Sequence, residues 1–472
     1  MGVPRSGRLA FMLLLPMLAL GGPAQGSHDA DVHSQNMLLV ATVDTGRGGE
    51  MAFWRDTAVL AHGAGDADLR NDGFVLLDIS DPMNPVRISE FTCVASAWDI
   101  AIWGDLVILG SWKEATTGPA CDASVPAFPG PDGFTGIRLV SIKDPAHPIQ
   151  VGAVATKVGL GAHTFTLLPD LDHLDEAGRK DPRLLAYMSS STAEPLELVE
   201  VPLREPAAAR LVTEFAAPAS SACHDFSLFL PRNLAICSNA ATTIYDISDP
   251  LRLVHLATIA NPTAHHHGSV VSWDGKTLVI GDEPLPELFV EGFTDAEPEV
   301  RDCYAGTDVP RGVYWFYDIT NARNPVLTDT FQLPREVHGG YCSSHQMNVV
   351  PFSDGRNVLV AAWYLGGTTV VDFTDPRDVN EIAYYAASPA DPQRRSNPFS
   401  SYWYNGYVYA NNLHASLVGA IATTDRGLDV FKIQDAGLKH DVRLPYFNFG
   451  TQECLSSHGA GKTKAPCAAG SG

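Results

Sequence analysis

Histidine recurs through the middle of the chain in motifs that offer transition-metal ligands. It stands at His163, His224 and His345, and three consecutive copies, His265, His266 and His267, lie between the last two. A neutral imidazole nitrogen is a good donor for Zn, Cu or Fe, and its second ring nitrogen can be oriented by a neighbour. Four such groups at one point would hold one ion and leave a position for water or substrate.

Two acidic residues follow the histidine triplet at a spacing that suggests a shared site. Asp282 and Glu283 end the next β-rich run, and either one could act as an extra ligand, as an acceptor for a ligand's second nitrogen, or as a general base. Asp225 directly follows His224, but adjacent side chains of a strand point to opposite faces, so the sequence predicts no pairing between them.

A recurring phrase explains how residues so far apart would meet. It is a short run of β-forming residues that usually ends in Asp-Pro or Asn-Pro, where proline fixes φ and lacks a donor, so the strand must end and turn. The copies lie at 73–85, 137–148, 198–203, 243–250, 314–325, 369–376 and 428–435, and those at 198–203 and 428–435 lack the Asp-Pro stop. Further short strands precede and follow each copy.

Units of about four strands that recur every ~45–70 residues predict an all-β chain, a seven-bladed β-propeller with four-stranded antiparallel blades. The run 37–44 matches the outermost strand of the other units, so we expect it to pair beside 400–435 and close the ring with the N-terminal strand. A β-sandwich with a second domain is the alternative, but it does not need repeated copies of one phrase.

The phrase resembles the LVIVD repeat, a propeller repeat of secreted or surface bacterial proteins, over residues of about 44–435. This resemblance implies seven blades and an extracellular location, and it implies no particular activity. In such a fold the start of each inner strand reaches the central channel. The aligned position is held by Gly49, Trp98, His163, His224, one residue of the histidine triplet, His345 and Ser400.

The ends of the chain predict export. Residues 1–26 combine two arginines, an apolar run and a final stretch of small residues, which is typical of a cleaved secretory signal. The apolar run is too short to span a membrane. We therefore expect a propeller over 37–440 and a C-terminal tail over 441–472, stapled by a disulfide. The protein would be secreted, or lie at the bacterial cell surface or in the periplasm.

Eight cysteines in an oxidising compartment favour disulfides. Nearest-neighbour pairing gives Cys93–Cys121, Cys223–Cys237, Cys303–Cys342 and Cys454–Cys467. Only the Cys223–Cys237 pair has a geometric argument, because its members bracket a strand–turn–strand unit and would face each other across a hairpin.

The charge balance narrows the partners. The chain has 32 Lys and Arg against 54 Asp and Glu, a formal charge of -22, which disfavours nucleic acid. No segment after the signal is long enough to span a membrane, and the sequence leaves the oligomeric state open. A small molecule or a protein at the channel mouth is the expected partner.

Two functions remain open from the residues. One is an extracellular binding scaffold with a histidine-lined channel that binds a transition metal. The other is a metal-dependent redox or hydrolytic enzyme with the metal held by His163, His224, the triplet and His345, and with Asp282 or Glu283 as the proton acceptor. A purely structural role, in which each histidine bonds a neighbouring blade's backbone, is the alternative to both.

Overall fold

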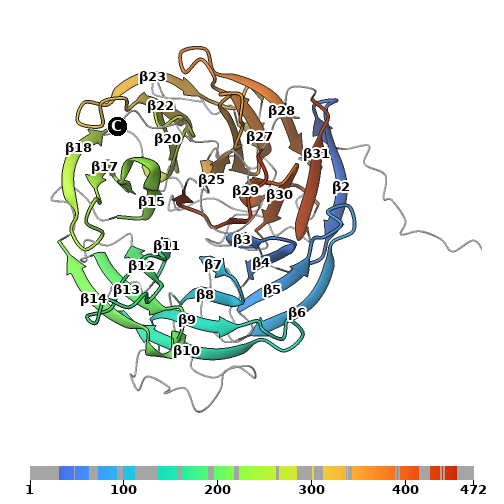
Figure 1. Cartoon of the computed structure of the whole chain (residues 1–472). Coiled ribbons are helices and arrows are strands. Elements are labelled where there is room, and N and C mark those ends of the chain that lie inside the picture. Colours follow the sequence, from blue (N-terminus) through green and yellow to red (C-terminus); the bar gives the residue numbers. More distant parts are fainter. Residues whose placement is uncertain are drawn as a thin grey trace, which may run out of the picture.

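The computed structural model describes residues 31–453, apart from 47, 63–72, 93–98, 112–134, 157–161, 190–195, 217–222, 262–264, 284–299, 302–311, 336, 339–342, 389–390, 392–393, 414–425, 436–437 and 439–441. These residues form an all-β structure whose sheets stand around a common centre, as in a β-propeller (Figure 1). Its helical elements among the described residues are two short 3₁₀ turns, Pro206–Ala208 and Leu230–Arg232.

Each strand nearest the centre of the ring begins a run of antiparallel strands that extends outward (Figure 1). These inner strands are β3 (Met51–Trp54), β7 (Ile100–Trp103), β11 (Thr164–Asp170), β15 (Asp225–Phe229), β19 (His266–Val271), β25 (Ser343–Val349) and β29 (Pro398–Tyr404). The second strands are β4 (Thr57–His62), β8 (Leu106–Ser111), β12 (Arg183–Ser189), β16 (Leu234–Ser238), β20 (Thr277–Asp282), β26 (Val358–Tyr364) and β30 (Tyr407–Asn412).

The outer half of each run follows in the same order. The third strands are β5 (Gly73–Asp78), β9 (Gly136–Ser141), β13 (Leu196–Pro202), β17 (Ala241–Asp246), β22 (Tyr314–Asp318), β27 (Gly367–Asp372) and β31 (Leu428–Ile433). The outermost are β6 (Val86–Thr92), β10 (Ile149–Ala155), β14 (Arg210–Phe215), β18 (Val254–Ala260), β23 (Val326–Phe331), β28 (Asn380–Ala386) and β2 (Met37–Val43). Two short pairs of strands complete the list, β21 (Val300–Arg301) with β24 (Val337–His338), and β1 (Val32–His33) with β28.

The N-terminal strand pairs as the sequence predicts. β2 runs antiparallel to β31, with Met37 opposite Ile433 and Val43 opposite Leu428. The two runs that end in β28 and β2 also merge into one nine-stranded sheet, because Gln346 and Ser400 form a single parallel bridge between β25 and β29. The N-terminal strands β1 and β2 are therefore held in one sheet with β31.

The repeated phrase is a pair of side-chain-capped turns. The carboxylate of Asp78 accepts a hydrogen bond from Ser80 N, and Asp81 accepts one from Met83 N. The same two bonds recur at Asp246 and Asp249, at Asp318 and Asn321, and at Asp372 and Asp375. An Asp or Asn side chain that accepts a hydrogen bond from the amide two residues later replaces a hydrogen bond of the sheet. The aspartates therefore end each third strand together with the proline.

Apolar cores fill the spaces between neighbouring sheets. One joins β3–β6 to β7–β9 through Phe74, Phe91 and Ile102, and another joins β12–β13 to β15–β17 through Tyr187 and Phe226. Both faces of a middle strand are buried, which agrees with the continuous Val, Leu and Ile runs of the phrase. Among the described residues, no helix is long and apolar enough to cross a membrane.

The described part of the C-terminal tail, residues 442–453, lies along the inner strands. We call it the C-terminal strap. It contributes β32 (Tyr446–Phe447), antiparallel to β3, and β33 (Thr451–Gln452), parallel to β15. Figure 1 shows this last coloured segment crossing the middle of the ring.

Candidate functional site

Four of the predicted histidines gather at the start of consecutive inner strands. His163 directly precedes β11, His224 directly precedes β15, His267 is the second residue of β19, and His345 is the third residue of β25. His224, His267 and His345 are buried, and His163 is partly buried. Because each inner strand faces the centre of the ring, the side chains converge although the chain separates them widely.

The four rings form a continuous row. His163 and His224 approach through their Nε2 atoms, which lie 2.9 Å apart. The ring centroids of His224 and His267 are 4.3 Å apart, and those of His267 and His345 are 4.2 Å apart. Each imidazole is thus in contact with the next one, and ligand atoms of His224, Asp225 and His267 lie within 4.8 Å of one another.

Three of the four rings have an acceptor beside Nδ1. His345 bonds Phe399 O through Nδ1 at 2.5 Å, while His224 Nδ1 and His267 Nδ1 each lie 3.3 Å from a different oxygen of Asp225. An acceptor at Nδ1 places the proton there and leaves Nε2 as the unprotonated donor. This is the arrangement that metal-ligating histidines show in proteins.

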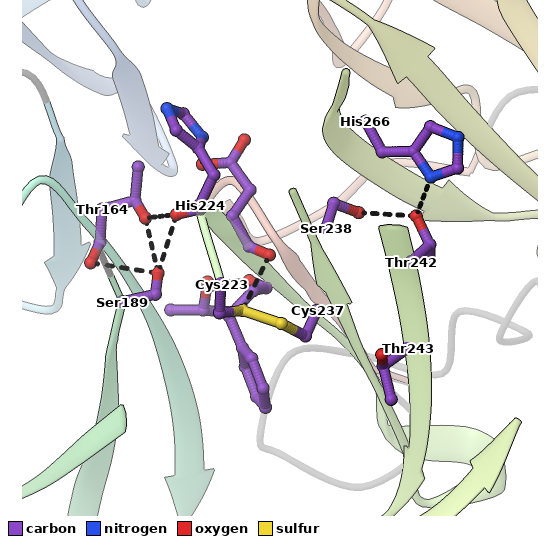
Figure 2. Close-up of a disulfide and its surroundings, with 12 residues drawn as sticks. Thr164, Ser189, Cys223, His224, Cys237, Ser238, Thr242, Thr243 and His266 are labelled. Atoms are coloured by element: carbon purple, nitrogen blue, oxygen red, sulfur yellow. Dashed lines mark hydrogen bonds and ion pairs between the residues drawn. A yellow bond between two sulfur atoms is a disulfide. The ribbon is translucent and has the colours of Figure 1, made fainter. Parts of the chain in front are cut away.

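The prediction that Asp225 does not pair with His224 is therefore wrong. Regular alternation holds within a strand, but β15 begins only at Asp225, and His224 occupies a bend before it. Its backbone oxygen is held there by Thr164 Oγ1 and, at 3.0 Å, by Ser189 Oγ (Figure 2). Asp225 is itself fixed by Gln346 Nε2 at 2.9 Å from its second oxygen, so both residues belong to the site.

The acidic pair divides into two roles. Glu283 Oε2 lies 3.3 Å from His267 Nε2, and ligand atoms of His267, Glu283 and His345 all lie within 4.8 Å of one another. Asp282 instead accepts hydrogen bonds from His265 N at 2.7 Å and from Gly312 N at 2.8 Å. Asp282 thus anchors the backbone beside the triplet, while Glu283 faces the imidazole row.

The structure also separates the members of the triplet. His266 is fully buried and its Nδ1 bonds Thr242 Oγ1 at 2.8 Å, away from His224 (Figure 2). The centroid of His265 is 6.1 Å from that of His224, at the edge of the row. His267 alone of the three contacts both His224 and His345. Strand alternation accounts for the opposite directions of His266 and His267.

Burial keeps most imidazoles of the row uncharged, which is the form that can bind a metal. It lowers the pKa of His163 and of His345 to about 3, and it holds the pKa of His267 well below its usual range. His224 differs, because burial lowers its pKa but the carboxylate of Asp225 outweighs burial and raises the value overall. At neutral pH the other three imidazoles are therefore uncharged donors.

Several polar atoms of the site lack a hydrogen bond. Among the residues that the structure describes, Asp225 Oδ1, His267 Nδ1 and Gln346 Oε1 are buried with no hydrogen-bond partner. Two of these atoms have only the looser 3.3 Å contacts given above. Buried polar groups are normally satisfied, so the two oxygens, Asp225 Oδ1 and Gln346 Oε1, fit a site that an additional donor or positive group completes.

The C-terminal strap closes the other end of the inner strands. Asn448 bonds both backbone groups of Ile102, at 2.8 and 3.0 Å, and Gln452 does the same for Val271, at 2.9 and 2.7 Å. Val271 is the last residue of β19, whereas His267 stands at its beginning. The ring of Phe449 lies 3.5 Å from the position that a Cβ at Gly268 would occupy, directly below His267.

The predicted Cys223–Cys237 disulfide is confirmed. The two Cα atoms are 5.2 Å apart across β15 and β16, with Cys223 adjacent to His224 (Figure 2). It ties the residue before His224 to the neighbouring strand. The pairs Cys93–Cys121, Cys303–Cys342 and Cys454–Cys467 lie outside the described residues, as do the signal segment and Trp98.

No protein-family model matches the chain, and no curated protein matches its sequence. The solved structures to which it is similar include a periplasmic gluconolactonase of Pseudomonas aeruginosa, at 11% identity and a TM-score of 0.48, which covers 75% of this chain and 89% of that one. They also include the β-propeller domain of Cps50 (Swd1) from Myceliophteria thermophila, at 10% identity and a TM-score of 0.49, covering 84% and 99%. The assignment of this chain to the all-β propeller class rests on its own strand pairing and ring arrangement.

Proposed function

We propose that the protein binds one transition-metal ion through Nε2 of His163, His224, His267 and His345, with Glu283 beside it. The observation that carries the proposal is the convergence of four imidazoles from consecutive inner strands, three of them with an acceptor at Nδ1. Imidazole nitrogen with one carboxylate suits Zn, Cu or Fe, whereas Ca²⁺ and Mg²⁺ require oxygen ligands.

The alternative of a purely structural histidine row fits the contacts less well. A structural histidine bonds backbone or hydroxyl groups, as His266 does through Nδ1 with Thr242 Oγ1. In the row, Nε2 of His163, His224 and His267 instead faces another imidazole or Glu283. Nitrogen lone pairs directed at each other stabilise a fold only when a proton or a cation lies between them.

A bound metal would supply Lewis-acid or redox chemistry at this position. The residues of the chain prepare the place for it: Asp225 and Phe399 O hold the Nδ1 protons, and Glu283 lies where it can accept a proton from a group beside His267 Nε2. We favour a metal-binding scaffold, and the arrangement of Glu283 is what supports the second candidate, a metal-dependent enzyme with Glu283 as its general base.

The wider assignment is part of the same proposal. Runs of four strands beginning at each inner strand support a seven-bladed ring of the LVIVD-repeat kind, closed by β2 against β31. The Cys223–Cys237 disulfide supports export to an oxidising compartment. A small molecule or a protein at the histidine end of the channel is the partner that this geometry favours, because the strap covers the other end of several inner strands.

The test is elemental analysis of protein produced without a histidine tag. We expect close to one equivalent of a transition metal, lost in the His224→Ala/His345→Ala double variant and kept in His147→Ala, whose ring is exposed and lies in a turn. Unchanged metal content in the double variant would refute the site. Loss of metal with the melting temperature retained would support it.

Catalysis is tested separately through Glu283. A Glu283→Gln variant keeps the shape of the side chain but cannot accept a proton. If the protein is an enzyme, we expect this variant to keep its metal and lose turnover with an identified substrate. Retention of both would leave the metal-binding scaffold as the function.

A further inference from the structure

A second polar layer lies one residue deeper along the inner strands than the imidazole row. Glu50 follows Gly49, Asp99 follows Trp98, Asp225 follows His224 and Gln346 follows His345. The side chains of Glu50, Asp99, Asp225 and Gln346 are all buried, with exposed fractions of 1–3%. We call these four residues the acidic layer.

The layer concentrates negative groups without a basic side chain. In the part of the chain that the structure describes, no lysine or arginine bonds Glu50, Asp99 or Asp225. The groups that act on Glu50 are Asp99, Asp225, the hydroxyl of Tyr402 and the backbone amide of Met51, and the charged group that acts on Asp99 is Asp225. Three carboxylates in one water-poor space cannot all be ionised, because like charges and burial both disfavour the charged form.

The three carboxyls differ in their hydrogen bonds. Asp225 has Gln346 Nε2 at one oxygen and an imidazole Nδ1 beside each oxygen. Asp225 is thus held by the imidazole row.

Glu50 and Asp99 lack comparable support. The hydroxyl of Tyr402 donates to Glu50 Oε2, while Glu50 Oε1 is buried without a hydrogen-bond partner among the described residues. Asp99 has two backbone donors and no side-chain donor among the groups that act on it: Phe165 N, 2.6 Å from Oδ2, and the amide of Ile100. Burial, followed by the charge of Asp99, holds the pKa of Glu50 well above its usual range, and burial does the same for Asp99.

We propose that Glu50 and Asp99 are a store of protons beneath the imidazole row, in which both carboxyls are neutral acids. Glu50 Oε1 carries one of these protons, since its other oxygen already accepts from Tyr402. Neutral acids allow three carboxyls to share the layer without a counter-ion. The proposal concerns the metal-free chain and does not require the metal site.

The store has a consequence if the proposed metal site is correct. A dication in the imidazole row would add positive charge next to the layer and favour the ionised carboxyls. The O–H bond of Glu50 or Asp99 would then break, the carboxyl would become a carboxylate, and the proton would pass to the solvent. Metal uptake would thereby release more protons than the imidazoles alone provide.

Gly268 keeps space open at this level. A Cβ built there would lie 2.9 Å from Gln346 Oε1 and 3.1 Å from Asp225 Oδ2, closer than side-chain atoms pack. The glycine therefore lets two polar groups of the layer meet beneath His267. Glu50 and Asp99 enter the same layer from β3 and β7, on other inner strands.

The test is infrared difference spectroscopy on metal-free protein near neutral pH. The carbonyl band of a protonated carboxylic acid is separate from that of a carboxylate and shifts in D₂O. We expect this band in the wild-type-minus-variant spectrum for Glu50→Gln and for Asp99→Asn, with the sum of both in the double variant. Glu90→Gln is the matched control, since Glu90 is partly exposed and paired with Arg87, and we expect no acid band from it.

Two results would overturn the proposal. One is a difference spectrum that shows only carboxylate bands for both variants. The other is a tightly bound Ca²⁺, Mg²⁺ or Na⁺ ion in dialysed protein that is lost in Glu50→Gln, because a hard cation would then neutralise the layer. The Asp99→Asn and Glu50→Gln variants each report on one carboxyl, so the test still holds if one of the two variants folds poorly.

Adding Zn²⁺ to the same samples separates this proposal from the metal site. Bleaching of the acid band on Zn²⁺ addition would support both. A band that is present without metal and unchanged by Zn²⁺ would support the proton store while contradicting its coupling to a metal in the row.

Discussion

His163 and His224, 61 residues apart in the chain, face each other through Nε2 atoms 2.9 Å apart at the inner edge of two neighbouring sheets. His224 is held from behind, since its backbone oxygen is bonded by Thr164 and Ser189 and its Nδ1 lies next to Asp225. The approach is thus imposed by the fold, and only a proton or a metal ion makes it favourable.

The triplet gives the sharpest test of which residue belongs to the site. His267→Ala should abolish stoichiometric metal binding, because His267 joins His224 to His345. His266→Ala should keep the metal and lose about 1 kcal/mol of stability through the Thr242 bond. Metal content by mass spectrometry and urea unfolding measure the two effects. Equal metal loss in both variants would contradict the assignment.

Asp225 should control the protonation of two ligands at once. In Asp225→Asn, the amide nitrogen would donate toward a ring that needs an acceptor, so one imidazole would lose its correct tautomer. We expect metal affinity to fall by about 10–100-fold, with an altered visible spectrum of the Co²⁺-substituted protein.

The comparison variant for Asp225 is Gln346→Leu. It removes the amide that fixes Asp225 but leaves the carboxylate, so its effect on affinity should be smaller than that of Asp225→Asn. A spectrum and an affinity that do not change in Asp225→Asn would show that this carboxylate does not orient the ligands.

Much of this arrangement follows from the sequence, and the reasons are local. The repeated Asp-Pro phrase predicts the strand ends because both Asx bonds and the proline act within a few residues. The histidines at equivalent positions predict convergence for the same reason, since one structural position is copied from unit to unit. The pairing of β2 with β31 also follows from the copied pattern.

Other features depend on contacts that no local pattern encodes. Strand alternation predicts that Asp225 does not pair with His224, and it fails because the strand begins one residue after His224. Asp282 and Glu283 look equivalent in sequence, and only the backbone donors of His265 and Gly312 distinguish them. The acidic residues that directly follow the aligned position, at 50, 99 and 225, were the available signal for the second layer.

The C-terminal strap should contribute strongly to stability although the sequence suggests a tail. Asn448→Ala removes two hydrogen bonds to buried backbone groups of Ile102, and leaving these groups unsatisfied should cost about 1–3 kcal/mol. Asn84→Ala, which removes one exposed bond to Asp81, is the control and should change stability by less. Chemical unfolding compares them, and equal effects would mean that the strap is dispensable.

The N-terminal end predicts how stability responds to acid. Burial alone would raise the pKa of Asp31, but hydrogen bonds from Tyr385 and Ser388 outweigh it and lower the value. A carboxyl whose pKa is lowered in the folded state stabilises the fold above its unfolded pKa of about 3.9, and this stabilisation is lost as the pH falls through the folded value. Asp31→Asn should therefore be less stable than wild type at pH 7, and the difference should shrink at about pH 3.

Urea unfolding of both proteins at the two pH values measures that change. The control is Asp44→Asn, because Asp44 bonds only the amide of Gly46 in the described chain. A difference between wild type and Asp31→Asn that stays constant with pH would mean that the Asp31 charge does not stabilise the fold. In that case, the backbone pairing of Val32 and His33 with β28 would be enough to hold the N-terminal end in place.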